Sequence, residues 1–223
     1  MSHYLQKELD ALLTNYPQLS SCRDDIWNVC ALVTGCYRQG GLVMTCGNGG
    51  SAADAEHIVG ELMKSFKRKR LLSGEQRAVL EAAFPGEGAY LADHLQQGIP
   101  AISLVSQVAL LSAFANDVVP DMAFAQQVFV YGCPGDVLIG LSTSGNSRNV
   151  VNACRVARAY GMKTVALTGE HGGKLRDICD VTVRVPANET CRIQEYHLPV
   201  YHALCAMVER DLFHFPEEDV QTQ

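Results

Sequence analysis

Five short apolar runs divide the chain, and each has the composition of a buried strand. The runs cover residues 42–46, 100–105, 135–141, 163–167 and 180–185. Between them, apolar residues recur at the three- and four-residue spacing of helices. Strands that alternate with helices in this way predict an α/β fold built on a doubly wound, five-stranded parallel sheet.

Helical patterns predict three additions around this sheet, within what is expected to be a single domain. The additions are N-terminal helices, a helical insertion and an acidic tail, at residues 1–39, about 68–98 and 214–223. The second N-terminal helix is expected to begin at Ser20 or Ser21. A closing helix over residues 192–213 contains Pro199, which should kink the helix or mark its start.

The first apolar run leads directly into a glycine-rich turn and then into a helix. Gly47, Gly49 and Gly50 leave no Cβ in the way of a close ligand, and Asn48 lies between them. Ser51 can cap the helix and also bind the ligand. The free N–H groups of the first helical turn point toward the same place, so this unit predicts a backbone cradle for an anion.

A second strand-to-helix loop, residues 142–147, is rich in hydroxyl groups. Its sequence, Ser-Thr-Ser-Gly-Asn-Ser, can donate several hydrogen bonds to one phosphate without a lysine. Either loop alone could be only a turn with a helix cap. In a parallel sheet both loops lie at the same edge, and together they favour a sugar-phosphate site. The P-loop and dinucleotide patterns are missing from the sequence, which argues against a nucleotide triphosphatase and against a dinucleotide ligand.

Two pairs of polar residues could supply metal-binding or proton-transfer groups near this binding site. His57 and Glu61 stand four residues apart on one face of the helix that follows the glycine turn. Gln194 and His202 lie in the closing helix at a spacing that can bring both toward one side. Such a set can bind a zinc-type ion, and a glutamate and a histidine can exchange a proton with a carbon next to a carbonyl. An ordinary pair on a helix surface is the alternative interpretation of His57 and Glu61.

Composition is that of an ordinary globular protein, with 48% apolar and 19% charged residues. The net charge of −6 argues against a direct nucleic-acid partner. Nine cysteines without a framework spacing are expected to be reduced and mostly buried, which predicts a cytoplasmic location. No signal peptide or membrane span is expected, and therefore no membrane partner. The basic run 64–70 is expected to be a solvated helix end, or else to help hold a substrate phosphate.

The ordered set of motifs resembles one known family, the phosphoheptose isomerases of the sugar isomerase (SIS) domain superfamily. The likeness covers residues 40–212 except the insertion. It rests on segments 46–51, 142–147, 167–169 and 192–195, together with His57, Glu61 and His202. It implies a flavodoxin-like parallel sheet and a homotetramer with active sites at subunit interfaces.

The resemblance also implies a reaction. It is the conversion of sedoheptulose 7-phosphate to D-glycero-D-manno-heptose 7-phosphate through an enediol, for heptose-nucleotide and cell-surface glycan synthesis. Glu61 would remove the proton from carbon 1 of the ketose, and His202 would be the partner acid. A Zn²⁺ ion would be bound by His57, Glu61, Gln194 and His202. The sugar phosphate would contact Asn48, Gly49, Gly50, Ser51, Asn116, Asp117, Ser142, Thr143, Ser144, Ser147 and Gln194.

Two positions depart from the family pattern and leave other functions open. Cys191 stands where these isomerases often have an aspartate. Ser65 stands where an arginine is usual near the phosphate, and Lys64 or Lys67 could replace that charge. A different phosphosugar substrate is therefore one alternative. The others are a non-catalytic tetrameric scaffold that binds the bacterial replication initiator, and a phosphosugar-sensing domain of a regulator. The presence of both catalytic candidates favours the enzyme.

Overall fold

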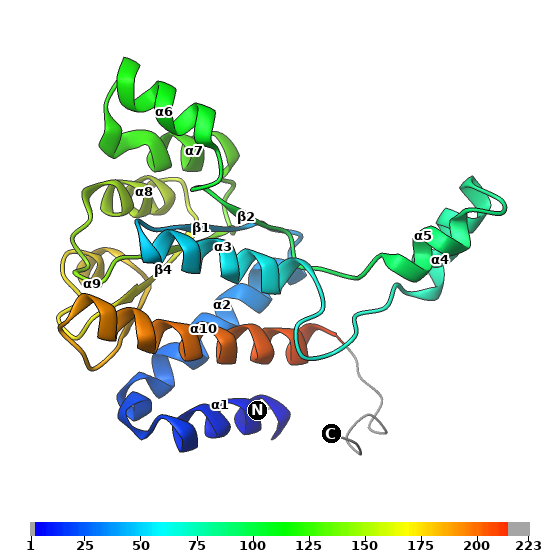
Figure 1. Ribbon diagram of the computed structural model, residues 1–223, viewed down its shortest axis with the longest axis horizontal. Helices are drawn as coiled ribbons and strands as arrows, with labels where there is room; N and C mark the ends of the chain where they lie inside the picture. Colours follow the sequence, from blue (N-terminus) through cyan, green and yellow to red (C-terminus); the bar gives the residue numbers. More distant parts are fainter. Residues whose placement is uncertain (1–2, 214–223) are drawn as a thin grey trace.

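The computed structural model describes residues 3–213, and its centre is a five-stranded sheet (Figure 1). The strands are β1 (Val43–Cys46), β2 (Ala101–Ser103), β3 (Val137–Leu141), β4 (Lys163–Thr168) and β5 (Val181–Arg184). They follow the order β2-β1-β3-β4-β5, and every pairing is parallel. This is the flavodoxin-like order, whose switch point lies between β1 and β3. The predicted α/β fold with a doubly wound parallel sheet is confirmed.

Both faces of the sheet are buried because its side chains alternate between two apolar cores. On β3, Val137 and Ile139 belong to one core and Leu138 belongs to the other. The first core is completed by α1 (His3–Asn15), α2 (Arg23–Arg38), α3 (Gly50–Met63) and α10 (Thr190–Leu212). The second is completed by α7 (Ala123–Tyr131), α8 (Arg148–Ala159) and α9 (Leu175–Ile178). Burial on both sides explains why the strands read as continuous apolar runs.

The N-terminal region forms the expected helices, with one difference. Residues Pro17–Cys22 form a 3₁₀ helix, so α2 begins at Arg23 and not at Ser20 or Ser21. Proline suits the first turn of such a helix because its φ is fixed and it has no N–H to leave unpaired. Both α1 and α2 pack against α10, and these helices therefore cover one face of the sheet.

The closing helix α10 begins at Thr190, nine residues before Pro199, so the expectation that this proline could mark the start is wrong. A proline inside a helix removes one backbone hydrogen bond. The turn that follows buries Val200, Tyr201 and Leu204, and this packing holds the helix against the sheet across the missing bond.

His197 lies on α10 with no exposed surface. Its Nε2–H donates to the carbonyl oxygen of Thr168 at 3.3 Å, while Nδ1 has no hydrogen-bond partner among the described residues. Burial disfavours the charged imidazolium and lowers the pKa of His197 from 6.5 to about 4. This histidine is therefore a neutral packing residue at neutral pH.

The buried His197 is expected to make the free energy of unfolding depend on pH. Between about 6.5 and about 4 the unfolded chain binds a proton at this position and the folded chain does not. Stability therefore falls as the pH is lowered through that window, by about 1.4 kcal/mol per unit from this side chain alone. Urea unfolding at several pH values should show a smaller slope for His197→Gln than for the wild type. A matched His171→Gln change at an exposed position should leave the slope unchanged, and equal slopes in all three proteins would contradict this account.

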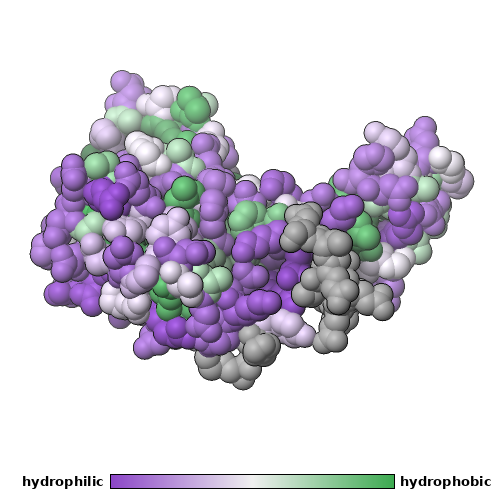
Figure 2. All heavy atoms as spheres, turned by 60° about the horizontal axis from the view of Figure 1, so that its bottom comes forward, coloured by the Kyte–Doolittle hydropathy of each residue, from purple (hydrophilic) through white to green (hydrophobic). Residues whose placement is uncertain are grey.

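The insertion forms a projecting arm of two helices, α4 (Gly74–Ala83) and α5 (Gly88–His94) (Figure 1). A capping box starts α4: Gln76 N–H donates to Ser73 Oγ, and Ser73 N–H donates to the Gln76 side chain. The two helices pack mainly on each other, and α4 buries no residue. Hydrophobic surface is therefore left exposed on this arm. Figure 2 shows hydrophobic surface on a second projection as well, at the other end of the molecule. That projection carries α6 (Val108–Asp117) and α7.

The basic run after α3 is not a solvated helix end. The helix ends at Met63, and Arg70 is 2% exposed. Arg70 Nε donates to the Glu209 carboxylate on α10 at 2.7 Å, and its other nitrogens donate to the carbonyl oxygens of Leu62 and Glu61. The Glu209 carboxylate also accepts two backbone N–H groups of the run. This buried ion pair therefore ties the end of α3 to α10.

All nine cysteines are free thiols, and all but Cys133 and Cys191 are buried, as predicted. Within residues 3–213, no helix is both long and apolar enough to cross a membrane. The acidic tail at 214–223 lies outside the described residues.

Candidate active site

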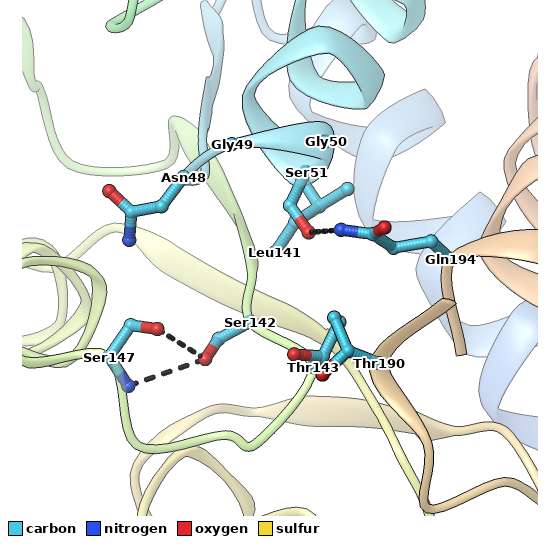
Figure 3. Close-up of a pocket in the computed structure, with 10 residues that line it drawn as sticks. All are labelled: Asn48, Gly49, Gly50, Ser51, Leu141, Ser142, Thr143, Ser147, Thr190 and Gln194. Carbon is cyan, nitrogen blue, oxygen red and sulfur yellow. Dashed lines mark hydrogen bonds between the residues drawn. The ribbon is translucent and has the colours of Figure 1, made fainter. Parts of the chain in front are cut away.

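The two predicted loops meet at the switch point of the sheet. Strand β1 ends in the glycine turn before α3, and its neighbour β3 ends in the hydroxyl-rich loop before α8. Together the loops form most of a pocket of about 430 Å³ (Figure 3). Its lining residues are Asn48, Gly49, Gly50, Ser51, Leu141, Ser142, Thr143, Ser147, Thr190 and Gln194. We name this pocket the cradle.

Each loop of the cradle is held in shape by its own contacts. Ser147 N–H and the Ser147 hydroxyl both lie within hydrogen-bond distance of Ser142 Oγ, at 3.3 and 2.9 Å. Gly145 has φ +66°, and a Cβ there would lie 1.9 Å from the carbonyl oxygen of Gly172. Only glycine fits at that position, because both the backbone conformation and the space exclude a side chain.

The glycine turn is shaped in the same way. Gly49 has φ +56°, which favours glycine, and a Cβ on Gly50 would lie 2.8 Å from the Gln194 side chain. Gln194 reaches from α10 toward Ser51, with its Nε2 3.5 Å from Ser51 Oγ. The first turn of α3 is thus open to a ligand on one side and supported by α10 on the other.

A reciprocal amide pair joins the two loops, and sequence reasoning missed it. Asn48 and Asn149 each donate to the other's carbonyl oxygen, at 3.0 and 2.8 Å. Thr190, at the start of α10, was also missed as a lining residue. Asn149 and Thr190 belong to no recognisable local motif, because only the fold brings Asn149 to Asn48 and Thr190 to the cradle.

The cradle is suited to a phosphate. None of its ten lining residues is charged, and the groups it offers to an anion are hydroxyl and backbone N–H donors at the starts of α3 and α8. One predicted phosphate contact is not part of this lining. Ser144 does not line the cradle, and its Oγ accepts the N–H of Asn146.

A second polar group lies farther along α3. His57 Nε2 is 3.3 Å from Glu61 Oε1, and His202 Nε2 on α10 is 3.4 Å from His57 Nε2. We name these three residues the His–Glu cluster. Lys64 Nζ donates to the other oxygen of Glu61 at 3.1 Å. The pKa of His202 lies below its usual value, mainly because burial disfavours the charged form and also because His57 is close.

The cluster combines three of the four predicted zinc ligands, and two imidazoles with a carboxylate are donors that zinc prefers. Gln194 is not with them, because it precedes His202 by eight residues, about 12 Å along the helix axis. Among residues 3–213 of one chain, no group of three or more His, Cys, Asp or Glu side chains has the arrangement needed to hold a metal ion by itself.

The cluster and the cradle are separate in one chain. None of the three cluster residues lines the cradle, and Glu61 follows Ser51 by ten residues, about 15 Å along α3. Asn116 and Asp117 are also away from the cradle. They form the last turn of α6, are exposed, and bond to each other at 2.8 Å.

The structure shows the surroundings of Ser65 and Cys191, the two positions that depart from the family pattern. Ser65 Oγ accepts the N–H of Arg70, and Ser65 N–H donates to Gln96. Lys67 bonds to Glu8 on α1 at 2.7 Å. Ser65 thus organises the loop that holds the buried arginine. Cys191 is exposed in the first turn of α10.

Comparison with known proteins finds one family over most of the chain. The family model described as SIS domain matches residues 7–91 and 91–169. The chain is 35% identical to a phosphoheptose isomerase from Akkermansia muciniphila, over 96% of this chain and 99% of the relative. It is 40% identical to one from Rhodospirillum rubrum, over 86% and 88% of the two chains.

Solved structures give the same match. A phosphoheptose isomerase from Neisseria gonorrhoeae superposes with a TM-score of 0.67 at 31% identity, covering 92% of this chain and 91% of that one. One from Francisella tularensis superposes with a TM-score of 0.68 at 28% identity, covering 91% and 98%. The fold and the sequence likeness therefore extend over nearly the whole of both chains.

Proposed function

Since the chain belongs to the phosphoheptose isomerases of the SIS domain family, we propose that it converts sedoheptulose 7-phosphate to D-glycero-D-manno-heptose 7-phosphate. The observation that carries the proposal is the pairing of an uncharged phosphate cradle with a carboxylate and an imidazole that meet between α3 and α10. An aldose–ketose isomerase needs both parts: one to hold the phosphate, and one to move a proton between adjacent carbons.

The reaction can be assigned to named groups. Hydroxyl and N–H donors of the cradle hold the phosphate. Glu61 removes a proton from carbon 1 of the ketose, and the electron pair forms the double bond of the enediol. His202 gives a proton to the oxygen on carbon 2. The enediol then loses the proton of its carbon 1 hydroxyl and gains a proton at carbon 2, which yields the aldose. The lowered pKa of His202 favours a neutral imidazole, which would give its N–H proton to the oxygen on carbon 2 and recover a proton from the carbon 1 hydroxyl.

The proposal includes a homotetramer with active sites at subunit interfaces. The distance between Ser51 and Glu61 along α3 supports it, because a second copy could place its own His–Glu cluster beside this cradle. The apolar helix α6 supports it as well, since α6 buries no residue in one chain and Val108 and Val118 are largely exposed. Packing of α6 on a second copy would also bring Asn116 and Asp117 to a neighbouring site.

A Zn²⁺ ion is the proposed cofactor, held by the His–Glu cluster and by Gln194. Since Gln194 lies toward the cradle of its own chain, the glutamine in this set would come from a second copy. When bound, such an ion polarises the carbonyl and hydroxyl oxygens of the sugar. A cytoplasmic location is also proposed, and the nine free cysteines support it.

The proposal is tested by incubating the purified chain with sedoheptulose 7-phosphate, with and without added zinc. We expect a heptose aldose 7-phosphate to appear, as followed by NMR of the sugar. Absence of turnover under both conditions, together with tight binding to a bacterial replication initiator, would contradict the proposal and favour a scaffold.

A further inference from the structure

The phenol of Tyr201 lies between two side chains of α3. Its hydroxyl donates to Asp54 Oδ1 at 3.2 Å and lies 3.0 Å from His57 Nδ1. Tyr201 is fully buried on α10, and its ring packs edge-on against the His57 ring. The other Asp54 oxygen is buried and has no hydrogen-bond partner among the described residues. The buried tyrosine is thus the side chain that links this carboxylate to the His–Glu cluster.

The direction of these hydrogen bonds follows from the number of protons available. A phenol carries one proton, and an ionised carboxylate can only accept. With the phenol proton directed at Asp54, the oxygen of Tyr201 can only accept from His57. In this arrangement His57 Nδ1 carries a proton, and in the neutral imidazole Nε2 is then left with a lone pair.

The freed lone pair is directed at the rest of the cluster. In this form His57 Nε2 and Glu61 Oε1, 3.3 Å apart, are both electron-pair donors with no proton between them, and His202 Nε2 lies 3.4 Å from His57 Nε2. We propose that Tyr201 and Asp54 are positioning residues that hold His57 in its Nδ1–H form, so that Nε2 is presented as an electron-pair donor to a metal ion. The consequence for metal binding rests on the proposed function, whereas the protonation pattern of His57 does not.

The test measures the two ring nitrogens of His57 in the metal-free, substrate-free full chain. In ¹⁵N NMR above the titration range of the imidazole, the wild type should show a protonated Nδ1 and an unprotonated Nε2. Asp54→Ala should reverse this pattern, because the phenol proton can then turn to Nδ1 while Nε2–H donates to Glu61. Tyr201→Phe should shift the population toward Nε2–H, because Nδ1 loses its acceptor. Tyr37→Phe removes a phenol hydroxyl elsewhere in the core and should leave the pattern unchanged.

Zinc affinity gives a second readout. Competition with a chelating dye should show about 10- to 100-fold weaker binding in Asp54→Ala and Tyr201→Phe, the usual effect of removing a partner of a metal-bound histidine. An Nε2–H form in the wild type, or unchanged nitrogen shifts and zinc affinity in both variants, would overturn the inference. Expected shifts in a wild-type chain that fails to isomerise the sugar would support the inference and contradict only the proposed function.

Discussion

The Glu61→Gln variant is expected to isomerise sedoheptulose 7-phosphate about 10²- to 10⁴-fold more slowly than the wild type. The amide has nearly the shape of the carboxylate but cannot take a proton from carbon 1. Binding of the phosphosugar should change little, because Ser51 and the hydroxyl-rich loop, and not Glu61, line the pocket proposed for the phosphate. Steady-state kinetics and calorimetric binding of the sugar would measure the two effects separately.

A matched control is available on the same helix. Glu56 lies on α3 with its carboxylate exposed and accepts the Ser106 hydroxyl at 2.7 Å. The Glu56→Gln variant should keep the wild-type rate. A Glu61→Gln variant that stays within tenfold of the wild type would show that another group removes the proton.

The Glu209→Gln variant is expected to lose about 3–5 kcal/mol of unfolding free energy, since it leaves the buried Arg70 guanidinium without its counter-charge. Side chains of both residues are at most 1% exposed, so water cannot compensate. The same change weakens the two backbone N–H bonds that Glu209 accepts from the loop after α3. Urea unfolding followed by circular dichroism would measure the loss.

The exposed pair of Lys67 and Glu8 is the control for this prediction. Its side chains are 49% and 18% exposed, and Glu8→Gln should cost about 1 kcal/mol or less. A double change of Arg70→Met with Glu209→Leu should recover part of the stability lost by Glu209→Gln, because no unpaired charge remains. A Glu209→Gln chain as stable as the control would contradict a structural role for the buried pair.

Local patterns were sufficient to predict the sheet and the position of the cradle. A strand buried on both faces, such as β3, must be apolar throughout, and the turn after β1 must be rich in glycine to approach a ligand. The contact of His57 with Glu61 follows from their four-residue spacing. These features depend on neighbours in sequence, and the sequence therefore displays them.

The features that were missed depend on neighbours in space. Arg70 belongs to a run that is typical of solvated surface, and its burial depends on a counter-charge, Glu209, that lies on α10. The role of Tyr201 depends on Asp54, which lies 147 positions earlier in the chain. Periodicity cannot predict such pairs, because it identifies the inward face of a helix but not the helix that will lie against it.

Proton transfer through an enediol is tested most directly by running the wild-type reaction in D₂O and locating deuterium in the sugar by NMR. We expect the aldose product to carry solvent deuterium at carbon 2, and the Glu61→Gln variant to incorporate almost none over the same time. A Glu61→Gln variant that forms the aldose as fast as the wild type, with the same deuterium content at carbon 2, would contradict the role assigned to Glu61.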